Sequence, residues 1–382
     1  MIFDLDTDRI RHRPGIKWGR HGPDVLAAWV ADMDVELPDV ILDAVNERLR
    51  SGGLGYDFYD EPVPVIDCFV RRMRDRFEWE IEPSEIIRLQ DVVQGLQLAI
   101  DQLSSPGDGI VVQTPVYPPF LSSIEGTSRR VISNPMINTD EGWRIDFDQL
   151  ESVFADPKTT LFILCNPHNP LGRVFTLAEL EAMNVLAERH DITVIADEIH
   201  FDLLYSPHQH VPFAGLNASA ASRTVTITAA TKSFNMAGFR LAFLHTHSAE
   251  LRARLDQVPP RILGGANILG QVATVAGWDH GQGWLDELVA GLDHNRHLLA
   301  ELLNQHLPGV VYRPPEATYL AWLDCRALSL ETEPFDAFMS GGVALNDGLG
   351  FGAGGQGHVR LNFATSPQML EMIVTRMAAA VS

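Results

Sequence analysis

The chain has 382 residues, of which 46% are hydrophobic and 21% charged, with 50 Asp and Glu residues against 29 Lys and Arg residues. The length exceeds what a single ordinary core supports, so we expect two packed domains, and the net charge of −21 disfavours nucleic acids and anionic membranes as partners. Because no apolar stretch approaches the roughly 18 residues of a membrane helix, we expect a cytoplasmic protein that acts on a small molecule.

The N-terminal part, residues 1–45, is predicted to be irregular. Several prolines interrupt any regular pattern there. We expect this segment to join the smaller of two domains. The larger domain is predicted at residues 46–270, and the smaller, C-terminal domain at residues 271–382.

From about residue 85 to residue 245, short β-rich runs alternate with helical patterns. This alternation predicts an α/β fold with a largely parallel sheet that helices cover. One helix is expected at 177–189, behind the capping candidate Thr176, and another at 93–103. The predicted strands are 110–113, 160–164, 192–196, 224–228 and 239–244.

After residue 269 the pattern changes. Long helical stretches run through residue 307, strands are expected at 319–323 and 359–363, and a last helix is expected at 367–381. This succession predicts a second α+β domain that is smaller than the first.

Polar side chains follow three successive predicted strands of the larger domain. Asn169 lies in the run Asn-Pro-His-Asn-Pro-Leu-Gly, Asp197 closes the next strand, and Lys232 follows the third. Because the carboxyl ends of parallel strands meet at one edge of a sheet, these groups can converge where α/β folds usually bind a ligand.

The residue types suggest chemistry with an aldehyde cofactor. A partly desolvated Lys232 favours the neutral amine and imine formation, although a solvated surface lysine is the ordinary alternative. Asp197 is costly to bury unpaired, so it is expected to face a cation such as a protonated pyridine nitrogen, with an ordinary helix cap as the alternative.

Several longer motifs occur in order along the chain. Together with the lysine run Thr-Ala-Ala-Thr-Lys-Ser-Phe-Asn-Met-Ala-Gly-Phe-Arg, they make the chain similar to the fold type I enzymes that use pyridoxal 5′-phosphate (PLP), the aspartate aminotransferase superfamily. Within it the chain resembles the MalY/PatB group of cystathionine β-lyases. The motifs are Trp-Val-Ala-Asp-Met-Asp (29–34), Gln-Thr-Pro-Val-Tyr-Pro-Pro-Phe (113–120), Cys-Asn-Pro-His-Asn-Pro-Leu-Gly-Arg (165–173), Asp-Glu-Ile-His (197–200) and Tyr-Leu-Ala-Trp-Leu-Asp-Cys-Arg (319–326).

The resemblance spans nearly the whole chain and implies a mostly parallel, seven-stranded sheet in a large PLP-binding domain. It also implies that Lys232 binds the cofactor as an imine, that Asp197 pairs with the pyridine nitrogen, and that Tyr117 stacks on the ring; these are the expected catalytic residues. Asn169 is expected to bind the ring hydroxyl oxygen. His200 stands where aminotransferases commonly carry a tyrosine near that oxygen.

A phosphate site is implied at the start of the helix that follows Asp91. The backbone near Val92 and Val93 is expected to bind the phosphate, with Thr231 and Arg240 as further donors. Asp91 itself stands where glycine is frequent in the family, so phosphate binding is expected to differ from that of other members.

Tyr56 resembles the family tyrosine that reaches the phosphate bound by a neighbouring subunit. This resemblance implies a homodimer with shared active sites. The alternative is that Tyr56 is simply a buried tyrosine. Arg360 matches the arginine that clamps the substrate carboxylate by two contacts, although a strand arginine alone would as readily face solvent. Ala31 and Asn169 complete the expected substrate-binding set.

The implied activity is a PLP-dependent C–S β-lyase that eliminates a thiol from an L-cysteine thioether and yields pyruvate and ammonia. With cystathionine the thiol is homocysteine, as in methionine biosynthesis. His200 favours elimination over transamination. An aminotransferase of class I/II is the alternative, and a regulatory or binding protein on the same fold is a second one, against which the intact Lys232, Asp197 and Arg360 argue.

The histidines show no metal-ligand spacing. His208 and His210 lie two residues apart on a loop flanked by prolines, and no metal is expected.

Overall fold

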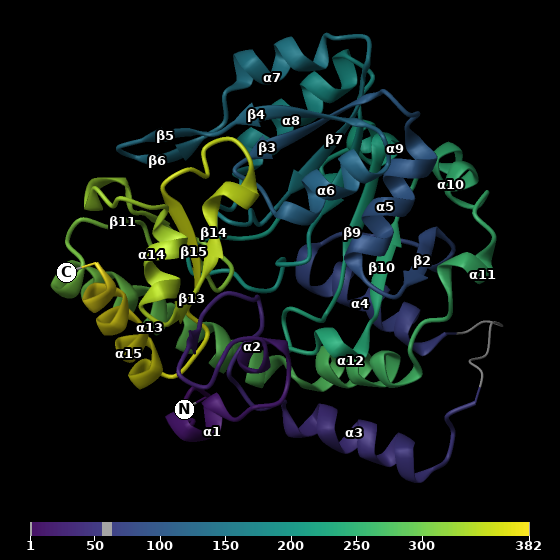
Figure 1. Ribbon diagram of the computed structural model, residues 1–382. Coiled ribbons are helices and arrows are strands. Elements are labelled where there is room, and N and C mark those ends of the chain that lie inside the picture. The colour runs from purple at the N-terminus through teal and green to yellow at the C-terminus, as the bar shows by residue number, and fades with distance from the viewer. Residues whose placement is uncertain (1, 56–62, 382) are drawn as a thin grey trace.

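The computed structural model describes residues 2–55 and 63–381. Its centre is a seven-stranded sheet in the order β2-β10-β9-β8-β7-β3-β4 (Figure 1). In this sheet β10 runs antiparallel to both of its neighbours, and the other adjacent strands are parallel. The strands are β2 (Ile86–Leu89), β3 (Gly109–Thr114), β4 (Arg130–Pro135), β7 (Thr159–Cys165), β8 (Thr193–Asp197), β9 (Thr224–Thr228) and β10 (Ala242–His245). The expected α/β fold with a mostly parallel sheet is confirmed.

Helices cover both faces of this sheet. The helices up to residue 263 are α1 (Thr7–Arg11), α2 (Ile16–Gly19), α3 (Asp39–Arg50), α4 (Pro64–Phe77), α5 (Val92–Leu103), α6 (Pro118–Gly126), α7 (Phe147–Phe154), α8 (Leu177–Arg189), α9 (Ala218–Arg223), α10 (Ala249–Leu255) and α11 (Pro260–Leu263). Along β3, Ile110 and Val112 pack with α5 and α6, whereas Val111 packs on the other side with α7 and α8. This alternation explains why the central strands are apolar throughout.

The second region holds α12 (Ile268–His280), α13 (Gln282–His306), α14 (Pro334–Ser340) and α15 (Pro367–Ala380). A four-stranded sheet in the order β11-β12-β15-β14 lies among them. Its strands are β11 (Val311–Tyr312), β12 (Leu320–Asp324), β14 (Asn346–Asp347) and β15 (His358–Asn362). The expected strands and last helix are found within one residue of their predicted limits.

The N-terminal segment packs against this second region. Strand β1 (Leu26–Ala27) pairs in parallel with β13 (Val343–Ala344), and α3 contacts α12 (Figure 1). The predicted joining of residues 1–45 to the smaller domain and the domain limits at 45 and 270 remain predictions. The remaining strands, β5 (Ile137–Thr139) and β6 (Gly142–Arg144), form a hairpin.

Local signals set several of these boundaries. Thr176 accepts a hydrogen bond from the Glu179 backbone while the Glu179 side chain accepts one from the Thr176 backbone, so a capping box starts α8 where predicted. The strand predicted at 239–244 is too long. It begins at Ala242, because residues 237–239 form a 3₁₀ turn and Arg240 follows with a φ of +51°.

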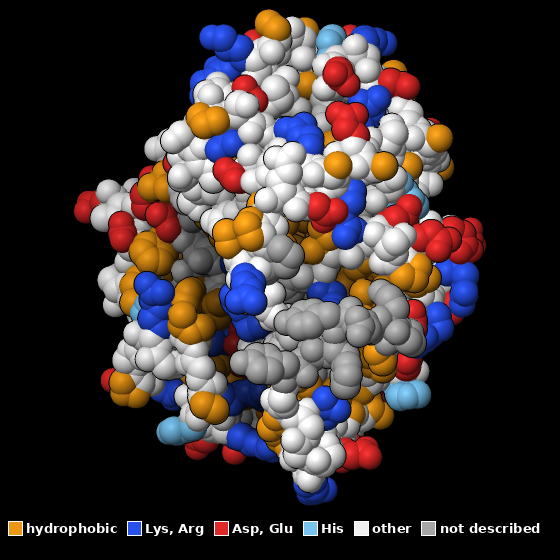
Figure 2. Space-filling view, turned by 90° about the vertical axis from the view of Figure 1, so that its right-hand side faces the viewer, with side chains coloured by type: hydrophobic (Ala, Val, Ile, Leu, Met, Phe, Trp, Pro, Cys, Tyr) orange, Lys and Arg blue, Asp and Glu red, His pale blue; other side chains and the backbone are white. Residues whose placement is uncertain are grey.

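No helix in the described part of the chain is long and apolar enough to cross a membrane. On the face shown in Figure 2, acidic and basic side chains are interspersed.

Candidate active site

A cavity of about 580 Å³ opens at the edge of the seven-stranded sheet, where β3, β7, β8 and β9 end. Parallel strands bring their carboxyl ends to this edge, as expected. The sequence-predicted residues that line the cavity are Ala31, Val92, Val93, Tyr117, Asn169, Asp197, His200, Thr231, Lys232 and Arg240.

Lys232 follows β9 by four residues, and its Nζ donates a hydrogen bond to the Ala31 carbonyl at 2.9 Å. Burial, assisted by the positive charge of Arg360, lowers the pKa of Lys232 to about 8, although Asp32 and Asp197 act in the opposite direction. About one tenth of this amine is therefore neutral at pH 7, far more than for an ordinary lysine, and the neutral amine is the nucleophilic form.

Asp197 ends β8 and is only 5% exposed. Burial raises the pKa of its carboxyl to about 7, while a hydrogen bond from the Ile199 backbone at 3.1 Å opposes that rise. Glu198 adds to the rise, and Lys232 offsets part of it. A cationic partner in the cavity would restore the charged carboxylate.

His200 is buried at the cavity, and its Nδ1 has no hydrogen-bond partner. Burial, together with the positive charges of Lys232 and Arg360, lowers the pKa of His200 to about 3, so the imidazole is neutral. Its ring meets Tyr319 edge-on at 6.1 Å. A buried polar atom without a partner beside a cavity indicates that a bound group supplies one.

Arg360 is 4% exposed and is not among the residues that line the cavity. It reaches the site through Asn169, whose Oδ1 accepts from Arg360 Nη1 at 2.9 Å. The other terminal nitrogen donates to Asn346 at 2.5 Å and to the Trp29 carbonyl at 3.2 Å. The predicted carboxylate arginine thus lies behind Asn169, and a carboxylate would have to displace one of these oxygens.

The start of α5 lines the end of the cavity where the phosphate is predicted to bind. Asp91 caps the helix by accepting from the Gln94 backbone at 2.8 Å, and the same carboxylate pairs with Arg240. A helix N-terminus with an arginine beside it suits an anion. The Asp91 carboxylate therefore stands among the groups that were predicted to bind the phosphate.

Sequence reasoning missed several lining residues, among them Gln90, Gln94 and Cys165. Gln90 precedes the predicted phosphate helix and Gln94 lies in its first turn, and this proximity was the available signal. Burial raises the pKa of the Cys165 thiol well above its usual range, so it stays protonated. Tyr56, the residue predicted to cross to a neighbouring subunit, lies outside the described residues.

The side chains at this cavity fit PLP. They supply an amine for the aldehyde, a buried carboxyl that a pyridinium nitrogen would stabilise, and a helix start with Arg240 for the phosphate. The unpaired Nδ1 of His200 offers a further polar contact.

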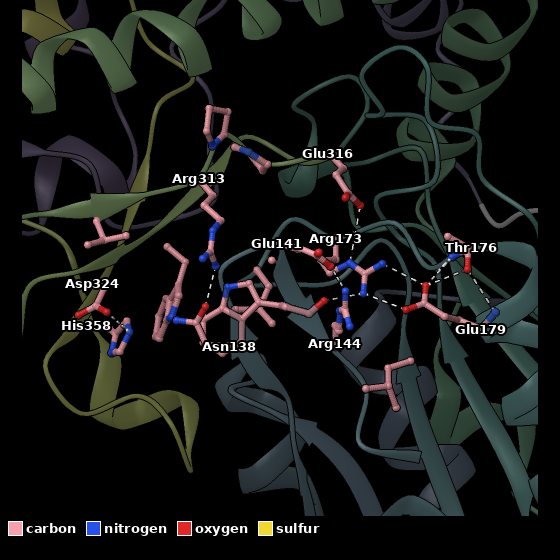
Figure 3. A pocket seen from close by; sticks show the side chains of 18 of the residues that line it. Asn138, Glu141, Arg144, Arg173, Thr176, Glu179, Arg313, Glu316, Asp324 and His358 are labelled. Atoms are coloured by element: carbon pink, nitrogen blue, oxygen red, sulfur yellow. Dashed lines mark hydrogen bonds and ion pairs between the residues drawn. The ribbon is translucent and has the colours of Figure 1, made fainter. Parts of the chain in front are cut away.

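A second cavity, of about 680 Å³, lies between the β5–β6 hairpin and the residues around Arg313 (Figure 3). It is larger, but it contains none of the predicted site residues. Many of its charged groups already have partners: Arg173 pairs with Glu179 at 3.0 Å, and Arg313 bonds Asn138 at 2.6 Å. We therefore place the active site in the cavity that holds Lys232.

Comparison with known proteins identifies the family of this chain. The aminotransferase class I and II family model matches residues 34–377. The cystathionine β-lyase PatB of Bacillus subtilis (strain 168) is 37% identical, with 100% of each chain covered. Cystalysin from Treponema denticola, solved with PLP, has a TM-score of 0.92 at 28% identity, covering 100% of this chain and 99% of its own.

The PLP-bound C–S lyase from Staphylococcus hominis has a TM-score of 0.92 at 29% identity, covering 99% of this chain and 98% of its own. The chain therefore belongs to the aminotransferase class I and II family of PLP-dependent fold type I enzymes, in the group that includes the cystathionine β-lyase PatB.

Proposed function

We propose that this protein is a PLP-dependent C–S β-lyase that eliminates a thiol from an L-cysteine thioether and yields pyruvate and ammonia. The observation that carries the proposal is that one cavity contains both a Lys232 amine with a lowered pKa and a buried Asp197 carboxyl. The lyase names of PatB and of the Staphylococcus hominis enzyme support elimination.

Binding and orientation come from the chain itself. Lys232 would hold the cofactor covalently, Asp197 would accept a hydrogen bond from its pyridine nitrogen, and Tyr117 would cover the ring. Arg360 offers two terminal nitrogens, at present bonded to Asn169, Asn346 and the Trp29 carbonyl, to an α-carboxylate.

When bound, PLP supplies an electron-withdrawing ring that takes up negative charge from the substrate α-carbon. The substrate amine would replace Lys232 on the cofactor, which frees Nζ to take the α-proton as general base, a role that its lowered pKa favours. Asp197 would keep the pyridine nitrogen protonated, so the charge would be stabilised inside the cavity rather than by solvent. The β-thiolate would then leave and take up a proton, and hydrolysis of the remaining unsaturated amino acid by water would give pyruvate and ammonia.

The test uses purified enzyme loaded with PLP and supplied with L-cystathionine. We expect pyruvate without any added 2-oxo acid, and homocysteine as the thiol product. The Lys232→Ala variant should keep its far-UV circular dichroism but lose nearly all turnover, because it lacks the base. Turnover that requires a 2-oxo acid would instead assign the chain as an aminotransferase, and normal turnover by the variant would overturn the role of Lys232.

The proposal extends to assembly and location. We infer a cytoplasmic homodimer in which Tyr56 of one subunit completes the phosphate site of the other, with a place in methionine biosynthesis if cystathionine is the natural substrate. The proposed division into residues 1–45, 46–270 and 271–382 puts the cofactor in the middle part.

A further inference from the structure

At the far edge of the seven-stranded sheet, Glu85, His245 and His247 gather around one point. In the part of the chain that the structure describes, they are the one group of three or more His, Cys, Asp or Glu residues whose possible ligand atoms lie within 4.8 Å of one another. His245 ends β10, whereas Arg240 and Leu241, just before that strand, line the PLP cavity. The group is therefore separated from the active site by the length of β10.

The contacts converge on one carboxylate. His245 Nε2 lies 3.1 Å from Glu85 Oε2, and His247 Nδ1 lies 2.8 Å from Glu85 Oε1. A tetrahedral ion with bonds of about 2.0–2.2 Å separates its ligands by about 3.3–3.6 Å. Small outward movements of the two rings would therefore open a space of the right size between these atoms.

The surrounding chain already holds the three side chains in place. Glu85 Oε2 accepts a hydrogen bond from the Glu82 backbone at 2.9 Å. Trp79 packs edge-on against both imidazoles, with ring centroids 4.6 Å from His245 and 6.3 Å from His247. Such outer contacts orient metal ligands and reduce the cost of ordering them.

Exposure leaves one side of the group open. The His245 side chain is fully buried at 0%, but the His247 and Glu85 side chains are 27% and 21% exposed. An ion there would be reachable from solvent, which could supply a water molecule as a further ligand. Two imidazoles and one carboxylate with an open position form a ligand set that zinc uses in proteins.

We propose that Glu85, His245 and His247 bind one Zn²⁺, with water completing its coordination. The ion would join two segments that are 160 residues apart in sequence, the start of β2 and the end of β10. Its role would be to stabilise the edge of the sheet, because ligands that bind only the folded chain raise its stability.

The experiment treats the PLP-loaded enzyme with EDTA, removes the chelator, and titrates the protein with ZnCl₂ by calorimetry while Tm is followed separately. We expect one Zn²⁺ per chain and a higher Tm, with the cofactor absorbance unchanged. His247→Ala should weaken binding by at least about ten-fold, the order lost with even an outer-shell contact, and should remove the Tm increase. Glu85→Gln should do the same and serves as a second variant if the first folds poorly.

His190→Ala is the matched control. His190 also faces a glutamate, Glu151, at 3.8 Å and is 20% exposed, but it has no second histidine in such a group. The control should bind Zn²⁺ like the unmodified enzyme. No Zn²⁺ binding by the unmodified chain, or equal binding by His247→Ala and Glu85→Gln, would overturn the proposal.

Discussion

Burial shifts the pKa values of Asp197 and Lys232 in opposite directions, and both shifts move the values toward neutral pH. It raises the pKa of the acid to about 7 and lowers the pKa of the amine to about 8. Both shifts have the same origin, since a charged group loses hydration at the closed end of the cavity. Under the proposed function, bound PLP would supply a cation for the carboxyl and an aldehyde for the amine.

The raised pKa of Asp197 predicts how cofactor-free protein responds to pH. Between its usual value of 3.8 and the folded value of about 7, the folded state holds more protons than the unfolded state. The contribution of this group to stability therefore falls as pH rises through that window, by a few kcal/mol for a shift of this size, at about 1.4 kcal/mol per unit.

Asp197→Asn should remove this dependence while keeping the hydrogen bond from Ile199. Urea unfolding of the cofactor-free proteins at pH 5 and pH 8 measures this dependence. The unfolding free energy of the variant minus that of the unmodified chain should be more positive at pH 8 than at pH 5. A variant with the same pH slope as the unmodified chain would contradict this account of Asp197.

At the scale of elements, we expect the start of α5 to influence how tightly the cofactor phosphate is bound. Asp91 both caps the helix through Gln94 and pairs with Arg240, so a negative charge already occupies the position where an anion is expected. Asn at this position would still cap the helix but would leave Arg240 free for the phosphate.

We therefore expect Asp91→Asn to bind PLP more tightly by about two- to five-fold, the effect of one charge at a helix terminus. Absorbance titration of cofactor-free protein gives the Kd. Asp101→Asn, which changes an exposed carboxylate elsewhere on α5, is the control and should leave the Kd unchanged. Weaker binding by Asp91→Asn would mean that Asp91 positions Arg240 rather than competing for it.

Another element-scale feature is the turn after β7. Gly172 has a φ of +65°, and a Cβ there would lie 2.2 Å from the Pro315 side chain. Its carbonyl accepts from the Glu316 and Ala317 backbones at 2.8 and 2.9 Å. The loop that carries Asn169 is thus fastened to the C-terminal region, which also brings Arg360.

For the whole molecule, the proposed shared active sites predict complementation between variants. Lys232→Ala and Tyr56→Phe chains, unfolded together and refolded, should recover activity, because a mixed dimer contains one site with both residues intact. Random pairing makes half of the dimers mixed, so the gain approaches about a quarter of the unmodified activity.

The measurement compares this mixture with the two variants refolded separately and then combined. If Tyr56 serves the site of its own chain, or if the protein is a monomer, the two preparations should have equal activity.

The sequence alone determined most of the local structure and the chemistry of the cofactor. β9 has the limits that were predicted for it, and α8 begins at the predicted cap, because side-chain period and capping are properties of neighbouring residues. Asn169, Asp197 and Lys232 could be placed together because each follows a strand of a parallel sheet. The weakly apolar edge strand β4 and the short β2 were not predicted, since their patterns are less distinct.

The tertiary structure determined which residues that are distant in sequence become neighbours in space. The contact of Arg360 with Asn169, the pairing of Asp91 with Arg240, and the group of Glu85, His245 and His247 each join distant parts of the chain. They depend on the strand order β2-β10-β9 and on the position of β15 beside the loop that carries Asn169. No local pattern encodes that order, because a strand's side-chain period records which face is buried and not which strand becomes its neighbour.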